Sequence, residues 1–262
     1  GERDKESLFL FMTNLYTIDS KQAGFEDKEK AIQGCLLGTA IGDALGLSYE
    51  GLSKQRLRKL YPSLNRYHFL FDKGMVSDDT EHTCLVAQSL IVSQGEIDAF
   101  KKSLAKQLRV WLLGLPAGIG FATLRAILKL WLGFPPDKSG VFSAGNAPAM
   151  RSALLGVCYG QDAKTLKQLV KVTTRITHTD PKAEWGALAV ALAAYLSSLQ
   201  QTCSPQEYLA KLAELLKAEP AEELLSLLKT TIESVLSGQS PSVFAQTLGL
   251  HKGVTGYIYD TV

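Results

Sequence analysis

The chain has 262 residues, and its 28 basic and 26 acidic residues leave a formal net charge of +2. This length allows a sizeable core in one large domain or two small ones, and no Pro/Gly/Ser-rich linker divides the chain. The near balance of charge gives no reason to expect nucleic acid or an anionic membrane as a partner, so function must come from a local site.

The cysteines and the N-terminal residues indicate the compartment. Cys35, Cys84, Cys158 and Cys203 stand far apart and form neither a C-x-x-C pair nor a Cys/His zinc pattern, so we expect no disulfide and no structural zinc. Residues 7–18, SLFLFMTNLYTI, lack the long apolar region and cleavage site of a signal peptide. We therefore expect a reduced, cytoplasmic protein.

Helical spacing of apolar residues recurs along most of the chain, and alternating strand patterns are nearly absent. The predicted helices cover residues 26–45, 80–93, 97–113, 121–132, 146–159, 163–176, 182–199, 205–218 and 221–236. Asp162, Asp180-Pro181 and Ser204-Pro205 are start signals. The sequence predicts an all-α multi-helix bundle. Residues 183–199, apolar nearly all round, belong at its centre, and residues 207–216 and 222–236 at its periphery.

The first predicted helix contains GCLLGTAIGDALG, residues 34–46, with glycine at every fourth position: Gly34, Gly38, Gly42 and Gly46. A glycine inside a helix costs roughly 1 kcal/mol relative to alanine, so the bare backbone needs a reason. Residues four apart share one helix face, which predicts close contact with another helix. Because Gln33 and Asp43 interrupt the apolar run, we favour a buried helix of a soluble protein over a membrane span.

The most polar short motif is MVSDDTEH, residues 75–82, in which Ser77, Asp78, Asp79 and Thr80 supply clustered oxygen atoms. Such oxygens suit a hard divalent cation, Mg²⁺ or Mn²⁺, better than zinc. The alternative is a helix cap, since Asp78 and Glu81 have capping-box spacing and acidic residues favour the first turn. The residues alone leave both interpretations open.

Three further positions are candidates. In SAGNAPAMRSALLG, residues 143–156, small residues precede a predicted helix, whose free N–H groups could bind a phosphate. The pattern is equally consistent with Asn146 as an ordinary helix cap. His178 ends one predicted helix, where a structural histidine is the default. Glu50 directly follows the glycine-rich helix, and its default is an exposed loop residue.

Taken together, GCLLGTAIGDALGLSYEG, SDDTEHTCLVAQSLI, GNAPAMRSALLG and THTDPKAEWGALAVALAAYL resemble the ADP-ribosylglycohydrolase family, which includes the dinitrogenase-reductase-activating glycohydrolases. The match starts near residue 28, so residues 1–23 are an expected N-terminal extension and residues 24–262 the domain. The resemblance implies a compact all-α hydrolase that cleaves the glycosidic bond between ADP-ribose and a protein side chain or a small acceptor.

The resemblance also implies site residues. Glu50 matches the catalytic loop glutamate, and Ser77, Asp78 and Asp79 match ligands of a binuclear Mg²⁺ or Mn²⁺ centre. Gly145, Asn146 and His178 match residues that hold ADP-ribose. The implied partner is an ADP-ribosylated protein or a small molecule that contains ADP-ribose, with no nucleic acid and no membrane. The sequence ranks neither the acceptor (arginine, serine or a small molecule) nor the oligomeric state.

One family feature is missing. A second acidic turn of the type G-D-T-D-[ST] supplies further metal ligands in the family, and the nearest imitations here are Thr179-Asp180 and Asp260-Thr261. On this pattern the domain is C-terminally incomplete, its second metal site is incomplete, and we expect weak hydrolysis by this form. The alternative is a non-catalytic ADP-ribose-binding or crystallin-like structural relative of the same fold.

Overall fold

The computed structural model describes residues 25–52, 56, 59–60, 66–69, 73–116, 118–199, 202–250 and 253–262. Within these ranges the regular elements are helices, and β-structure is limited to isolated bridges, which confirms the predicted all-α class. The expected N-terminal extension, residues 1–23, lies outside the described residues.

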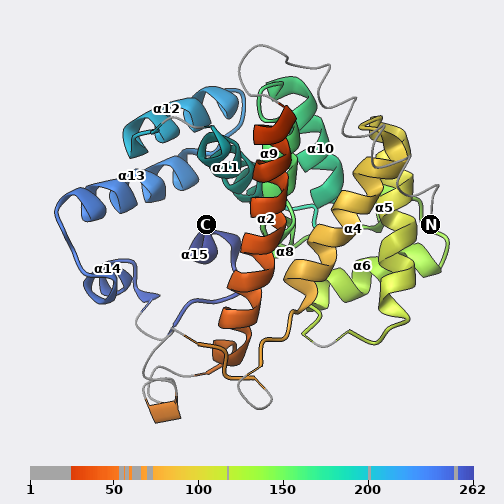
Figure 1. The fold of residues 1–262 in the computed structure, drawn as a ribbon, viewed down its shortest axis with the longest axis horizontal. Coiled ribbons are helices and arrows are strands. Elements are labelled where there is room, and N and C mark those ends of the chain that lie inside the picture. The colour runs from red at the N-terminus through yellow and green to blue at the C-terminus, as the bar shows by residue number, and fades with distance from the viewer. Residues whose placement is uncertain are drawn as a thin grey trace.

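Figure 1 shows the helices in chain order. They are α2 (Phe25–Gly46), the short 3-10 helix η1 (Leu47–Tyr49), α4 (Asp78–Ser93), α5 (Ile97–Leu112), α6 (Phe121–Trp131), α7 (Pro136–Ser139), α8 (Ala147–Met150), α9 (Ala153–Tyr159), α10 (Ala163–Arg175), α11 (Pro181–Ser198), α12 (Pro205–Leu215), α13 (Glu222–Leu236), α14 (Pro241–Thr247) and α15 (Ile258–Thr261).

The central helix is α11, which packs against α8, α9, α10 and α12. Most of its apolar residues are buried, as its sequence predicts. The contact with α9 is close: a Cβ atom on Gly156 would lie 1.8 Å from the carbonyl oxygen of Ala191. Helices α12 and α13 lie at one edge of the molecule (Figure 1), with Leu212 and Leu224 among the few side chains that they bury. The predicted centre and periphery are therefore confirmed.

The helix starts follow the predicted caps. Asp162 accepts hydrogen bonds from the N–H groups of Lys164 and Thr165, and Ser204 accepts one from Glu207. The predicted helix at residues 146–159 is wrong in one respect, because it is two helices, α8 and α9, interrupted at Arg151 and Ser152.

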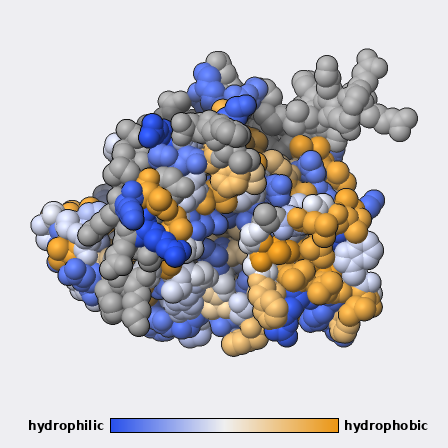
Figure 2. All heavy atoms as spheres, turned by 90° about the horizontal axis from the view of Figure 1, so that it is seen from below, coloured by the Kyte–Doolittle hydropathy of each residue, from blue (hydrophilic) through white to orange (hydrophobic). Residues whose placement is uncertain are grey.

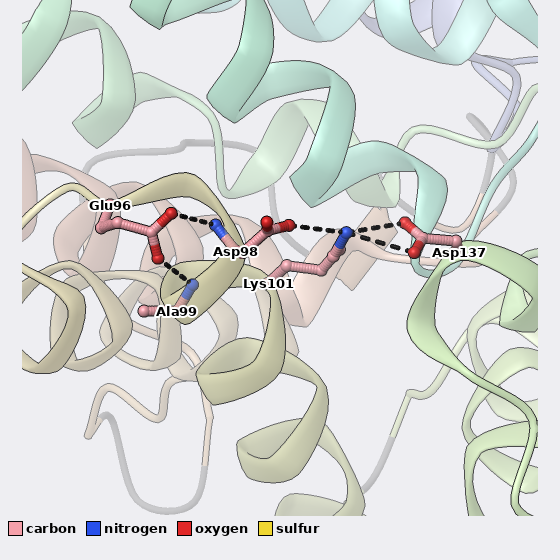
Figure 3. Close-up of polar contacts among 5 residues, drawn as sticks. All are labelled: Glu96, Asp98, Ala99, Lys101 and Asp137. Atoms are coloured by element: carbon pink, nitrogen blue, oxygen red, sulfur yellow. Dashed lines mark hydrogen bonds and ion pairs between the residues drawn. The ribbon is translucent and has the colours of Figure 1, made fainter.

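Figure 3 shows two sets of polar contacts at the start of α5. One caps the helix, and the other joins it to α7. The Glu96 carboxylate accepts hydrogen bonds from the N–H groups of Asp98 and Ala99, at 3.0 and 2.6 Å. The ammonium group of Lys101 lies 3.0 Å from carboxylate oxygens of both Asp98 and Asp137. Because Asp137 belongs to α7, this ion pair ties the two helices together.

The glycine-rich helix α2 crosses the front of the molecule in Figure 1. The prediction that its glycine face packs closely against another helix is wrong. Among the residues that the structure describes, a Cβ atom added at Gly34, Gly38, Gly42 or Gly46 would meet nothing within 4 Å, and Gly34, Gly38 and Gly42 are exposed. The opposite face, which includes the buried Asp43 and Ala44, contacts α4 and α9.

The expectation that α2 is buried is therefore wrong as well. The stretch Asp27–Tyr49 is long and apolar enough to cross a membrane, by length and composition only, and 11% of its most apolar window is buried. In the described part of the chain, α2 is a surface helix with one packed face.

Candidate functional site

A cavity of about 930 Å³ opens where several helix ends meet. It is bordered by the end of η1, the starts of α4 and α8, the loop between α5 and α6, and the loop at residues 253–256. Glu50, Asp78, Asp79 and Asn146 all line it, although they are scattered over about 100 residues of sequence. The structure therefore brings together the acidic residues and the asparagine that the sequence singled out.

Asp43 joins α2 to the first turn of α4, Ser77 to Thr80, which we call the acidic turn. One of its carboxylate oxygens accepts the hydroxyl of Ser77 at 2.7 Å. The other accepts the N–H of Ser77 at 2.7 Å, and the N–H and hydroxyl of Thr80 at 3.1 and 2.5 Å. The carboxylate is buried and fully used by these four donors. Asp43 thus fixes the first turn of α4, from which Asp78 and Asp79 project.

Sequence reasoning missed this role of Asp43. The signal was a lone carboxylate inside an apolar helical run, because a buried carboxylate needs hydrogen-bond or charge partners. The partners lie 34 and 37 positions away, so the local pattern does not identify them.

The capping-box interpretation of this turn is wrong. Ser77 occupies the N-cap position but makes no side-chain cap hydrogen bond, because its hydroxyl is bonded to Asp43. Glu81 does not reach back to the cap residue, since its carboxylate accepts a hydrogen bond of 2.7 Å from the Trp111 indole. Asp78 is the first residue of α4 and not its cap, and both Asp78 and Asp79 line the cavity from the first turn.

The electrostatics of the cavity reflect several carboxylates at close quarters. Burial raises the pKa of Asp78 to about 7, with further contributions from Asp79 and Glu50. The pKa of Asp79 is raised to about 6, mainly by burial and further by the negative charges of Asp43 and Glu50. The pKa of Glu50 is raised by burial and then by Asp43. Each group is thus easier to protonate than an isolated carboxyl, and a bound cation would relieve the repulsion.

These carboxylates offer the hard oxygen atoms that Mg²⁺ and Mn²⁺ prefer. Among the described residues, however, no three His, Cys, Asp or Glu side chains lie close enough to hold a metal ion by themselves. The donor set fits a hard cation whose remaining ligands are water or substrate oxygens. It does not form a closed protein cage.

The loop that contains Gly145 and Asn146 is held from two sides. Its backbone forms a bridge between Val141 and His178 on one side and between Gly145 and Tyr257 on the other. The Asn146 N–H donates to the Gly256 carbonyl oxygen at 2.9 Å. Asn146 starts α8 without a side-chain cap hydrogen bond, so the ordinary-cap interpretation is wrong and its amide remains available at the cavity.

Two predicted site residues lie behind the cavity wall. Ser77 is buried against Asp43, and His178 is buried behind Gly145, with its Nε2 atom 2.9 Å from where a Gly145 Cβ would lie. Neither belongs to the lining, nor does Gly145. Gly145 therefore leaves room for the imidazole, and His178 supports the loop from behind.

Apolar side chains surround one side of the opening. In Figure 2 they gather on the right, the side on which α5 and α6 lie in Figure 1. Leu113, Leu115 and Phe121 in and beside the α5–α6 loop are 66%, 86% and 74% exposed. The same loop supplies Gly118 and Gly120 to the cavity lining. A ligand that extends beyond the polar cavity past this loop would meet apolar surface.

Comparison with known proteins supports the resemblance carried by the motifs. The model of the ADP-ribosylglycohydrolase family matches residues 25–262. The chain belongs to the ADP-ribosylglycohydrolase family. A solved ADP-ribosylglycohydrolase-related protein complex contains a chain similar in fold, with a TM-score of 0.64 at 22% identity over 90% of this chain and 74% of that one.

Proteins similar to this chain include one of Archaeoglobus fulgidus, which is 32% identical over 63% of this chain and 55% of its own length. ADP-ribosylhydrolase ARH3 of Gallus gallus is 28% identical over 69% and 53%. The ADP-ribosyl-[dinitrogen reductase] glycohydrolase of Rhodospirillum rubrum is 26% identical over 60% and 54%. The chain thus spans about half the length of the curated relatives it matches.

Proposed function

We propose that this protein is a metal-dependent hydrolase that cleaves the glycosidic bond between ADP-ribose and a protein side chain or a small acceptor. The observation that carries the proposal is the meeting of Glu50, Asp78, Asp79 and Asn146 on one cavity of a chain that belongs to the ADP-ribosylglycohydrolase family. The family membership supports the hydrolase class, and the acidic cavity supports the metal.

Asp78 and Asp79, which line the cavity, would hold Mg²⁺ or Mn²⁺; the Ser77 hydroxyl, buried beside them against Asp43, would be a ligand only of a cation bound deep at this wall. Ser77 donates its hydroxyl proton to Asp43, which leaves its lone pairs as acceptors. When bound, such an ion would supply Lewis acidity and a fixed site for water and ribose hydroxyls. The cavity carboxylates orient these groups and offset the cation's charge.

Glu50 is suited to assist the water. It lies at the rim, directly after η1, and its pKa is raised by burial and by Asp43. A glycosidic bond breaks through an oxocarbenium-like state. As the water oxygen bonds to the anomeric carbon, a positioned carboxylate can accept one proton of the water and return it to the departing acceptor atom, so that free ADP-ribose and the protonated acceptor are formed. We assign Glu50 this role as general base.

The loop at Gly145 and Asn146 would bind ADP-ribose. The backbone bridges to His178 and Tyr257 fix this loop, and Asn146 reaches the cavity at the start of α8. His178 contributes from behind Gly145. A fixed loop loses little conformational entropy when it binds a ligand, which favours affinity.

The test is release of ADP-ribose from peptides ADP-ribosylated on arginine or serine, with Mn²⁺, with Mg²⁺ and with EDTA. Because the second metal site is expected to be incomplete, we expect weak metal-dependent release on one of these acceptors and a loss of about 10²–10⁴ in kcat for Glu50→Gln. The control is Glu29→Gln, which changes a carboxylate of α2 that bonds only to Gln33 among the contacts described. Binding of ADP-ribose with no release from either peptide would favour a non-catalytic ADP-ribose-binding protein.

A further inference from the structure

Arg151 is a fully buried cation behind the cavity, at the break between α8 and α9. Burial lowers its pKa to about 10, so the guanidinium remains charged at neutral pH. Its Nη1 lies 2.9 Å from Nδ1 of His82, and its Nη2 lies 2.8 Å from the carbonyl oxygen of Thr173 and 2.6 Å from the hydroxyl of Thr177. A guanidinium only donates hydrogen bonds, so all three partners are acceptors.

The direction of the Thr177 hydroxyl proton follows from its neighbours. The Thr174 carbonyl oxygen already accepts the N–H groups of Thr177 and His178, at 3.0 and 2.8 Å, and the Thr177 hydroxyl is 3.4 Å from it. The Nδ1 atom of His178 is closer to that hydroxyl, at 2.9 Å. The hydroxyl therefore accepts from Arg151 and donates to His178 Nδ1.

We propose that Arg151 and Thr177 are positioning residues that hold His178 as the neutral tautomer with its hydrogen on Nε2. The positive charge of Arg151 favours a lone pair over a hydrogen on the near nitrogen, Nδ1. The far nitrogen, Nε2, faces Gly145, where the missing Cβ leaves room for it. Through the hydrogen bonds from Arg151 to Thr177 and from Thr177 to His178, the buried charge leaves His178 with one N–H donor, at Nε2. This donor points at the loop that borders the cavity.

The protonation state is consistent with this arrangement. Burial and the charge of Arg151 lower the pKa of His178 to about 3, so the imidazole is neutral across the physiological range. A neutral imidazole carries one hydrogen, and which nitrogen carries it is set by the hydrogen bond at the other. The tautomer does not depend on the proposed function; only the consequence for ADP-ribose binding rests on it.

The test is ¹⁵N NMR of the imidazole groups in the full chain at pH 7.5, with His178 assigned by a His178→Gln variant. We expect His178 to carry its hydrogen on Nε2 in the wild-type protein and in Thr177→Ser, and to become a mixture of tautomers in Thr177→Val. His82 is an internal control, because Arg151 donates to its Nδ1 directly and its tautomer stays unchanged. A hydrogen on Nδ1 of His178 in the wild-type protein, or an unchanged tautomer in Thr177→Val, would overturn the proposal.

A second readout links the tautomer to the ligand. We expect Thr177→Val to weaken ADP-ribose binding, measured by calorimetry, by about tenfold, and Thr177→Ser to restore it. Unchanged affinity in Thr177→Val would show that the tautomer has no positioning role. If the wild-type protein binds no ADP-ribose while the NMR result holds, the proposed function fails and the tautomer assignment stands.

Discussion

At the scale of single residues, Asp43 contributes most to holding the acidic turn in place. Its carboxylate accepts four hydrogen bonds from Ser77 and Thr80, which places Asp78 and Asp79 at the cavity. Hydrogen bonds to a buried charged group are worth roughly 1.5–3 kcal/mol, so loss of part of this set is expected to be measurable.

Asp43→Asn tests this joint between α2 and α4. The amide replaces one carboxylate oxygen with a donor, so Ser77 or Thr80 loses an acceptor in a buried setting. We expect the free energy of unfolding in urea to fall by about 2–3 kcal/mol. The control Asp137→Asn changes a carboxylate that is 67% exposed, and it should cost less than about 1 kcal/mol. Equal effects of the two variants would contradict the role of Asp43.

The raised pKa values of Asp78 and Asp79 predict a pH effect on the metal-free protein. Their pKa values of about 7 and 6 lie above the ordinary value of 3.8, so the folded state binds protons more tightly than the unfolded state. This pair therefore contributes more stability as the pH falls from about 8 towards about 5.

Asp78→Asn replaces the ionisable carboxyl of Asp78 with a neutral amide. In EDTA at about pH 8 we expect it to raise the free energy of unfolding by about 1 kcal/mol, after discounting for screening by solvent, or roughly 2–4 °C in Tm. The gain should shrink near pH 5, where Asp78 is protonated in the wild-type protein. A lower Tm for the variant at pH 8 would show that the Asp78 charge is stabilised in the metal-free fold.

The sequence identified the cavity residues through their chemistry and their order, but not their supports. Short motifs that resemble those of the family contain the four cavity residues Glu50, Asp78, Asp79 and Asn146. Asp43 and Arg151 look like isolated polar residues in apolar helical runs, and their partners are distant in sequence. Ser77 and His178 belong to the motifs, yet whether they line the cavity or stand behind it depends on packing.

At the scale of elements, α2 shows what a periodic pattern can and cannot predict. The spacing of four correctly placed Gly34, Gly38 and Gly42 on one helix face. The prediction that this face packs against another helix was wrong. Ile32 and Leu36 lie on the other side and pack against the core, because burying apolar side chains is worth more than a close backbone contact.

Gly38→Ala and Gly156→Ala should therefore have opposite effects. A Cβ atom at Gly38 meets nothing within 4 Å in the described part of the chain, so alanine should stabilise the fold by about 0.5–1 kcal/mol through helix propensity. At Gly156 it would lie 1.8 Å from the Ala191 carbonyl oxygen, so α9 would be pushed from α11 at a cost of about 1–3 kcal/mol or more. Thermal unfolding of both variants checks this; destabilisation by Gly38→Ala would mean that another surface covers the glycine face.

At the scale of the whole molecule, the all-α class followed from helical periodicity and from cap residues that agree with it. Ser204 and Asp162 cap the helices that their positions predict. The short helices α7, α14 and α15 were not predicted, because four to seven residues are too few to show a period. The cavity itself is a tertiary feature, formed where helix ends from distant segments meet.

The most direct measurement is the affinity for ADP-ribose by calorimetry, with Mn²⁺ and with EDTA, for the wild-type protein, an Asp78→Asn/Asp79→Asn double variant and the control Asp137→Asn. If the acidic turn holds a cation that grips the ligand, binding should weaken by at least about tenfold in EDTA and in the double variant, and Asp137→Asn should bind as the wild-type protein does. The same affinity with Mn²⁺ and with EDTA, unchanged in the double variant, would contradict a metal-dependent ADP-ribose site in this cavity.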